Sequence, residues 1–301
     1  MRNKMIYFAL TVLCLTSCNS NNTERAEEQN LTKSTVDSIK FKSDYSEVNG
    51  IKMYYEIHGT GVPLVLIHGG GSTIGTSFGR IIPLLSKKYS VIAVELQNHG
   101  HSDFREIPQT FEQDADDVAA LMKNIGITKA SFLGFSNGGT TATQIAIRHP
   151  EVVDKLILAS AAFKRDQLFP GFFDMMQKAS LDNMPRELKE AFLKINPDSA
   201  RLQAMFEKDR DRMINFEDIS DEQIKSVKAL TLLIFGNADV VSPEHAVEMY
   251  RLIPNAHLAI LPGGHGDYIG EITTLSKTGK QKEFVVAMIE EFLDKPKDSE
   301  L

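Results

Sequence analysis

Short apolar runs alternate with longer amphipathic stretches from residue 45 onward. Ile51–Ile57 alternates between apolar and polar positions and follows the turn dipeptide Asn49-Gly50, which predicts a hairpin with Tyr45–Val48. Further apolar runs are typical of strands buried in a parallel sheet. These runs lie at 64–67, 89–96, 130–135, 155–159, 230–235 and 256–261.

Helical patterns separate these strands. We expect helices at Ile81–Leu85, Phe111–Ile125, Gly138–Arg148, Pro243–Leu252 and Lys280–Leu293, the second of them capped by Thr110. Strands that alternate with helices predict an α/β fold, a mostly parallel sheet with right-handed crossovers and helices on its flanks. Residues 162–227 contain no convincing strand and are helical in pattern. They are therefore predicted to form a helical lid, inserted after the sixth strand over the carboxyl edge of the sheet.

Composition narrows the class of protein further. The chain has 301 residues, of which 42% are hydrophobic, so it can bury a sizeable core. Its formal net charge is −7, with both signs interspersed along the sequence. This balance gives no reason to expect a nucleic-acid partner.

The first residues have the pattern of a targeting signal. A basic start, Met1–Lys4, precedes an apolar stretch at Met5–Leu15 that is too short to span a bilayer. The stretch ends in Leu15-Thr16-Ser17-Cys18, which resembles a bacterial lipobox. That resemblance implies a lipoprotein signal peptide at 1–17 and acyl chains such as palmitate on Cys18. An ordinary secretory signal with a chance cysteine is the alternative.

The lipobox resemblance sets the expected location and the role of the next segment. The polar residues 18–44 are predicted to form a flexible tether between a lipid anchor and the folded core. The protein would then lie in the bacterial cell envelope, on its periplasmic or surface face, with the membrane as a partner. Cys14 and Cys18 are the only cysteines, so the mature chain has no internal disulfide, cysteine nucleophile or cysteine metal site.

The strongest chemical signal is Gly134-Phe135-Ser136-Asn137-Gly138. It follows a predicted strand and opens a predicted helix, which is the context that places a serine on a tight turn as a nucleophile. A glycine-rich strand-to-helix turn without chemistry is the alternative. The N–H of Asn137, at the start of the helix, is expected to bind an oxyanion. A second N–H is expected from Gly70, because His68-Gly69-Gly70-Gly71 follows the strand at 64–67.

A base and an acid follow two later strands. Asp239 comes just after the run 230–235, and His265 comes just after the run 256–261. Both would lie at the carboxyl edge of the sheet, where open α/β folds bind ligands. We expect His265 to take the proton of Ser136 and Asp239 to orient His265. A single Asp or His in such a position is commonly a cap or turn residue, but the order Ser, Asp, His favours a triad.

These residues resemble the α/β-hydrolase superfamily over nearly all of Tyr45–Leu293. The match rests on the glycine loop after His68, the serine motif, Asp239 and His265. It implies an α/β-hydrolase core at 45–161 and 228–301 with the lid at 162–227. Many members have Asp-x-x-Gly-x-Gly-x-Ser where this chain has Glu95 and His99-Gly100-His101-Ser102. Packing of that loop is the favoured role of the two histidines, rather than metal binding. Epoxide hydrolases and haloalkane dehalogenases of this fold use an aspartate nucleophile, so Ser136 argues against both.

The predicted function is a serine esterase that cleaves a small or medium ester, lactone or thioester through an acyl-enzyme. No cofactor or metal is expected, and the sequence predicts no oligomeric state. The partner is a small, partly apolar acyl substrate, although most Phe and Met side chains of the lid are interpreted as packing. The alternatives are amide, peptide or C–C bond hydrolysis or acyl transfer with the same triad, or a non-catalytic envelope binding protein of this fold.

Overall fold

An eight-stranded sheet forms the centre of the protein, in the order β1-β2-β4-β3-β5-β6-β7-β8. The computed structural model describes residues 41–274 and 279–296. β1 and β2 form an antiparallel hairpin, β2 pairs antiparallel with β4, and all other neighbours are parallel. The strands are β1 (Phe41–Val48), β2 (Ile51–His58), β3 (Val62–Ile67), β4 (Tyr89–Val94), β5 (Ala130–Phe135), β6 (Val153–Ala159), β7 (Leu230–Gly236) and β8 (Ala256–Leu261).

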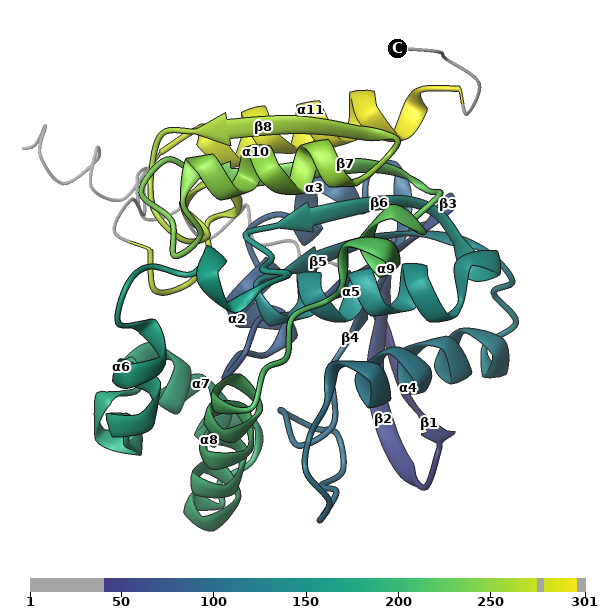
Figure 1. Cartoon of the computed structure of the whole chain (residues 1–301). Helices are drawn as coiled ribbons and strands as arrows, with labels where there is room; N and C mark the ends of the chain where they lie inside the picture. Colours follow the sequence, from purple (N-terminus) through teal and green to yellow (C-terminus); the bar gives the residue numbers. More distant parts are fainter. Residues whose placement is uncertain (1–40, 275–278, 297–301) are drawn as a thin grey trace, which may run out of the picture. The chain divides into compact units, whose positions relative to one another are not determined.

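Helices cover both faces of this sheet. One face packs against α4 (Phe111–Asn124), α5 (Asn137–Arg148) and α10 (Pro243–Leu252), and the other against α2 (Ile74–Phe78), α3 (Ile82–Leu85) and α11 (Gln281–Asp294). Figure 1 shows α4 and α5 on the near side of the sheet. Successive strand residues join opposite layers, as Val65 and Leu66 do in β3, because side chains alternate along a strand. Because both faces of these strands are covered, apolar residues occupy consecutive positions along them, which explains the continuous apolar runs in the sequence.

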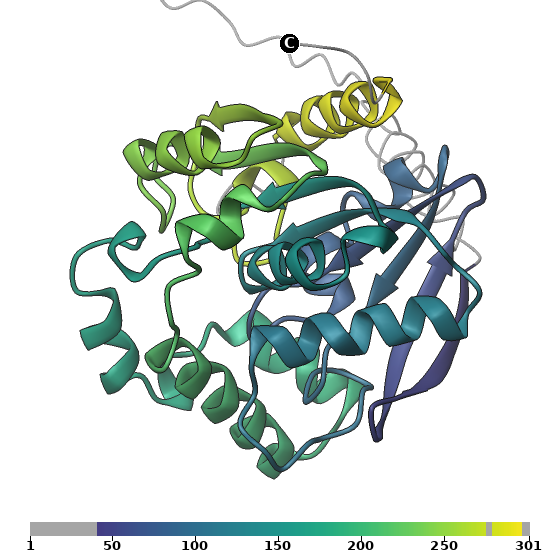
Figure 2. The ribbon, with the colours of Figure 1, turned by 45° about the vertical axis from the view of Figure 1, so that its right-hand side comes forward.

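Four α-helices lie between β6 and β7, in the segment predicted to form the lid. They are α6 (Phe172–Lys178), α7 (Arg186–Ile195), α8 (Ser199–Ile214) and α9 (Asp221–Lys225). Figures 1 and 2 show α6, α7 and α8 beside the edge of the sheet toward which β5 and β6 point. In the described part of the chain, no helix is both long enough and apolar enough to cross a bilayer.

Most predicted elements are confirmed within one or two residues at their ends. The Asn49-Gly50 turn is also confirmed, since both residues have positive φ. One boundary is wrong: residues 41–44, assigned to the tether, belong to β1. These residues pair with the end of β2, and the Phe41 ring stacks on His58 at 4.7 Å between centroids. The signal peptide, Cys18 and the rest of the tether lie outside the described residues.

The sequence analysis also missed the short helix α2 between β3 and β4. α2 begins after Thr73, which accepts a hydrogen bond from the N–H of Thr76, while the Thr76 hydroxyl accepts from the N–H of Thr73. Two threonines thus form a reciprocal cap of the kind usually made with Glu or Gln at the second position. The segment is only five residues long and mixes Gly, Thr and Ser, so its hydrophobic pattern carried no helical signal.

Candidate active site

Ser136 occupies a strained turn between β5 and α5. It is the residue before the first turn of α5, with φ 54° and ψ −123°, a region that non-glycine residues rarely adopt. Glycines make the turn possible, because a Cβ on Gly134 would lie 2.2 Å from the carbonyl oxygen of Gly138. A Cβ on Gly138 would lie 2.1 Å from the carbonyl oxygen of Ile67. Ser136 is therefore held tightly against the end of β3.

The two expected oxyanion donors are positioned beside this turn. We call residues 68–73, which follow β3, the oxyanion loop. Within the described part of the chain, neither the N–H of Gly70 nor that of Asn137 has a hydrogen-bond partner. The Asn137 side chain lies over Gly70, since a Cβ on Gly70 would meet its Nδ2 at 2.5 Å. The start of α5 adds the positive end of a helix dipole to these free donors.

Asp239 and His265 form a hydrogen-bonded pair. They follow β7 and β8, which are neighbours in the sheet, and His265 Nδ1 lies 2.7 Å from Asp239 Oδ1. A carboxylate only accepts, so Nδ1 carries a proton, and in the neutral ring the free electron pair is on Nε2. Burial raises the pKa of Asp239, but His265 and other donors outweigh it and hold that pKa below its usual value. The Asp239 side chain has no exposed surface, whereas 31% of the His265 side chain is exposed.

Two residues that the sequence analysis missed support Asp239. The Ser160 hydroxyl donates to Asp239 Oδ2 and lies 2.6 Å from the hydroxyl of Tyr268. The Tyr268 hydroxyl, whose single proton serves either Ser160 or Ile234, also lies 3.0 Å from the carbonyl of Ile234 in β7. Ser160 directly follows β6 and has a φ of 52°. The position of Ser160, directly after a strand that neighbours β7, could have identified it from the sequence. The residues around Tyr268 show no pattern that would predict its contact with Ser160.

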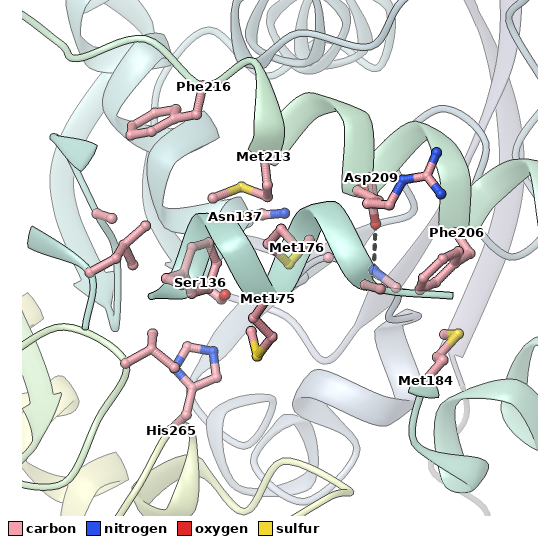
Figure 3. Close-up of a pocket in the computed structure, with 18 of the residues that line it drawn as sticks. Ser136, Asn137, Met175, Met176, Met184, Phe206, Asp209, Met213, Phe216 and His265 are labelled. Atoms are coloured by element: carbon pink, nitrogen blue, oxygen red, sulfur yellow. Dashed lines mark hydrogen bonds between the residues drawn. The ribbon is translucent and has the colours of Figure 1, made fainter. Parts of the chain in front are cut away.

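Ser136 and His265 line the same cavity, which we call the catalytic pocket. Figure 3 shows the His265 ring turned toward Ser136. Among the described residues, the Ser136 hydroxyl makes no hydrogen bond, including to His265. Catalytic hydrogen bonds are often long before substrate binds, so this geometry is compatible with proton transfer in a complex. The Phe135 ring packs against the His265 ring, with 4.8 Å between the ring centroids.

The catalytic pocket has a volume of about 720 Å³ and a largely apolar lining. The lid contributes much of that lining, so the interpretation of most lid Phe and Met residues as simple packing is only partly right. Phe163, Phe192 and Met205 are buried in the core. Seven others line the pocket: Phe172, Met175, Met176, Met184, Phe206, Met213 and Phe216. Flexible thioethers and aromatic rings suit a neutral apolar ligand group.

The histidines near the oxyanion loop hold neighbouring groups, as the loop-packing interpretation expected. His68 Nε2 accepts the N–H of Leu96 at 3.1 Å, and burial lowers the pKa of His68 to about 3, so it is neutral. His99 Nε2 lies 2.8 Å from a carboxylate oxygen of Asp209 in the lid. His101 Nδ1 lies 2.9 Å from Glu95, whose carboxylate raises the pKa of His101.

Comparisons with known proteins bear on the fold and its chemistry. A family model described as "alpha/beta hydrolase fold" matches residues 62–196. The human serine hydrolase BPHL is 28% identical over 232 residues, covering 72% of this chain and 77% of BPHL. A putative esterase/lipase of Haemophilus influenzae is 26% identical over 256 residues, covering 77% and 83% of the two chains. The structure of a meta-cleavage product hydrolase from Pseudomonas fluorescens is similar at a TM-score of 0.65 and 24% identity, covering 83% of this chain and 97% of that one.

Proposed function

We propose that this member of the α/β-hydrolase superfamily is a serine esterase that cleaves a small or medium carboxylic ester, lactone or thioester. The observation that carries the proposal is the buried Asp239 paired with His265, which faces the pocket that holds Ser136. The relative in Haemophilus influenzae named as an esterase/lipase supports ester bonds as the substrate. The free donors at Gly70 and Asn137 support acyl transfer rather than simple binding.

The reaction would proceed through an acyl-enzyme. Ser136 Oγ attacks the carbonyl carbon while its proton passes to His265 Nε2, and Asp239 stabilises the imidazolium that forms. The carbonyl electrons move onto oxygen, which the N–H groups of Gly70 and Asn137 bind. The tetrahedral intermediate then expels the alcohol or thiol, which takes the proton from His265. Water, activated by His265, releases the acid and regenerates Ser136.

The pocket favours a neutral acyl group. Its largely apolar lining would stabilise an aliphatic or aromatic chain through removal of apolar surface from water. The charged side chains of the lining, Asp209, Lys178 and Arg210, are of both signs, so the preference for a neutral group rests on the apolar lining. C–C bond hydrolysis stays as the second candidate, because a meta-cleavage product hydrolase shares this fold.

A substrate panel tests the type of bond. We expect p-nitrophenyl butyrate and hexanoate to be hydrolysed with kcat/KM at least about tenfold above that for the anionic hemisuccinate ester, because desolvating an unpaired charge is costly. The matching p-nitroanilide and a meta-cleavage dienoate serve as amide and C–C substrates, with initial rates followed by absorbance. Faster turnover of either than of every ester and lactone would contradict the proposal.

We also propose that the chain is a lipoprotein of the cell envelope, anchored through Cys18. The lipobox-like run Leu15–Cys18 supports it, and two or more acyl chains would give stable membrane binding. Expressed from its full sequence in a bacterium, the protein should fractionate with membranes and carry acyl mass on an N-terminal Cys18. Cys18→Ser should move it to the soluble fraction, whereas Cys14→Ser, inside the signal, should leave it in membranes. Unmodified Cys18 in purified protein would contradict the anchor.

A further inference from the structure

The lid helix α8 brings a buried carboxylate to the oxyanion loop. Asp209 is only 8% exposed. Its Oδ2 accepts the N–H of Gly71 at 2.5 Å, the bond drawn in Figure 3, and lies 2.8 Å from His99 Nε2. Its Oδ1 accepts from Arg212 at 2.6 Å and from Gln109 at 3.3 Å. Both oxygens are thus occupied by donors of the protein, so Asp209 serves the fold of the pocket rather than a polar group of the substrate.

Two cations hold Asp209 in its charged form. His99 Nδ1 faces the carbonyl of Gln97 at 2.9 Å, and its Nε2 faces Asp209. Both partners can only accept, so both ring nitrogens carry protons and His99 is an imidazolium. Burial lowers the pKa of His99, but the charge of Asp209 outweighs it and raises that pKa. Burial raises the pKa of Asp209, but His99 and Arg212 hold it below its usual value.

The bond to Gly71 restrains one of the two peptide units that meet at Gly70. Gly69, Gly70 and Gly71 are consecutive, so this loop has unusual conformational freedom. The peptide unit between Gly70 and Gly71 is planar, so fixing the N–H of Gly71 fixes the carbonyl of Gly70 as well. Ser72 Oγ contacts that carbonyl from the other side at 3.4 Å. The N–H of Gly70 lies in the preceding peptide unit, whose Gly69 carbonyl is 2.8 Å from His68 Nδ1. Asp209 and His68 thus restrain the two peptide units that meet at Gly70, one from each side.

We propose that Asp209 is a positioning residue through which lid helix α8 holds the oxyanion loop in its active geometry. This inference rests on the proposed function, because it assigns the N–H of Gly70 to the oxyanion. The lid then has a second role besides lining the pocket. Opening of α8 away from the core would release Gly71 and remove the restraint on the carboxyl side of Gly70, leaving only the one from His68.

Because Asp209 is negatively charged, the inference can be tested by whether kcat rises or falls when that charge is removed. A Cβ on Gly70 would lie 3.3 Å from Asp209 Oδ2, so the carboxylate is close to the expected oxyanion site. Electrostatics alone would make its removal favourable, since a negative charge repels an oxyanion. Loss of positioning would make its removal unfavourable. The direction of the change in kcat therefore separates the two effects.

The variant Asp209→Asn is the main test. Its amide has one oxygen, and the charged guanidinium of Arg212 is the strongest donor around it. We therefore expect the oxygen to turn to Arg212 and Gln109, so that Gly71 loses its acceptor. We expect kcat for p-nitrophenyl butyrate to fall by about 10- to 100-fold, a little less than for deleting an oxyanion donor. KM should change by less than about threefold, since apolar binding is retained. Asp211→Asn, on the same helix with a half-exposed side chain paired to Arg210, is the matched control and should change kcat by less than about twofold.

Hydrogen exchange gives a readout that does not need catalysis. In the wild type the amide of Gly71 should be protected, and in Asp209→Asn its exchange should accelerate, as measured by NMR or by mass spectrometry of the peptide with residues 68–73. If Asp209→Asn does not fold, His99→Gln removes the neighbouring charge and should give a smaller loss of both kcat and protection. If the wild type did not hydrolyse esters, the proposed function would be refuted. Hydrogen exchange at Gly71 would still show whether Asp209 holds the oxyanion loop. Unchanged protection in a folded variant, or a higher kcat in Asp209→Asn, would overturn the inference.

Discussion

Ser136→Ala should abolish ester turnover while the fold persists. Without the hydroxyl no acyl-enzyme forms, so kcat/KM for p-nitrophenyl butyrate should fall by a factor of about 10⁴ or more. The backbone at this position should be unaffected, because alanine keeps the Cβ and meets the same strain at φ 54° as serine does. The measurements are the initial rate of p-nitrophenol release and the midpoint of thermal unfolding.

A fluorophosphonate probe sharpens this test. The wild type should gain the probe's mass on the peptide that contains Ser136, and Ser136→Ala should not be labelled. Ser226→Ala is the matched control, because this exposed serine at the end of α9 bonds only locally to the carbonyl of Gln223. It should retain both turnover and labelling. Failure of the wild type to label at Ser136 would favour a non-catalytic envelope binding protein of the same fold.

The fold was predictable because its signals are local. Strands buried on both faces must be apolar throughout, and runs such as Ala130–Phe135 satisfy this in every position. The order of these runs with amphipathic helices then limits the topology to a few parallel sheets. The edge strand β1 was predicted too short because all four residues of Phe41–Asp44 are exposed and three of them are polar, so they show no alternation. Its pairing depends on the neighbouring strand β2, which composition does not reveal.

The site residues that directly follow strands could be predicted from the sequence. Asp239 and His265 follow neighbouring parallel strands, so topology alone brings them near each other, and the structure places them 2.7 Å apart. The lid contact was hidden for the opposite reason. Asp209 lies in a run of charges, Glu207–Arg212, that is typical of a solvent-exposed helix face. Only its spacing of four residues from both Met205 and Met213 indicates that it interrupts a buried stripe.

His265→Ala should cost about as much activity as loss of the nucleophile. Without an imidazole near Ser136, nothing in the proposed mechanism removes the serine proton, so kcat should fall by about 10⁴-fold or more with little change in KM. The chain offers a matched control in His149→Ala. His149 also pairs with an aspartate at 2.7 Å, through Asp116, and its side chain is 28% exposed, but it lies outside the catalytic pocket. That variant should keep its turnover, as measured by the same p-nitrophenol assay.

The double variant Ser136→Ala with His265→Ala distinguishes a catalytic unit from two independent contributions. If His265 acts only by activating Ser136, its removal has no further consequence once the serine hydroxyl is gone. The double variant should then be no less active than either single variant within about threefold, since residues of one unit are strongly non-additive. Losses that multiply would mean that His265 serves another step, such as direct activation of water. In that case the acyl-enzyme route would have to be replaced by direct hydrolysis.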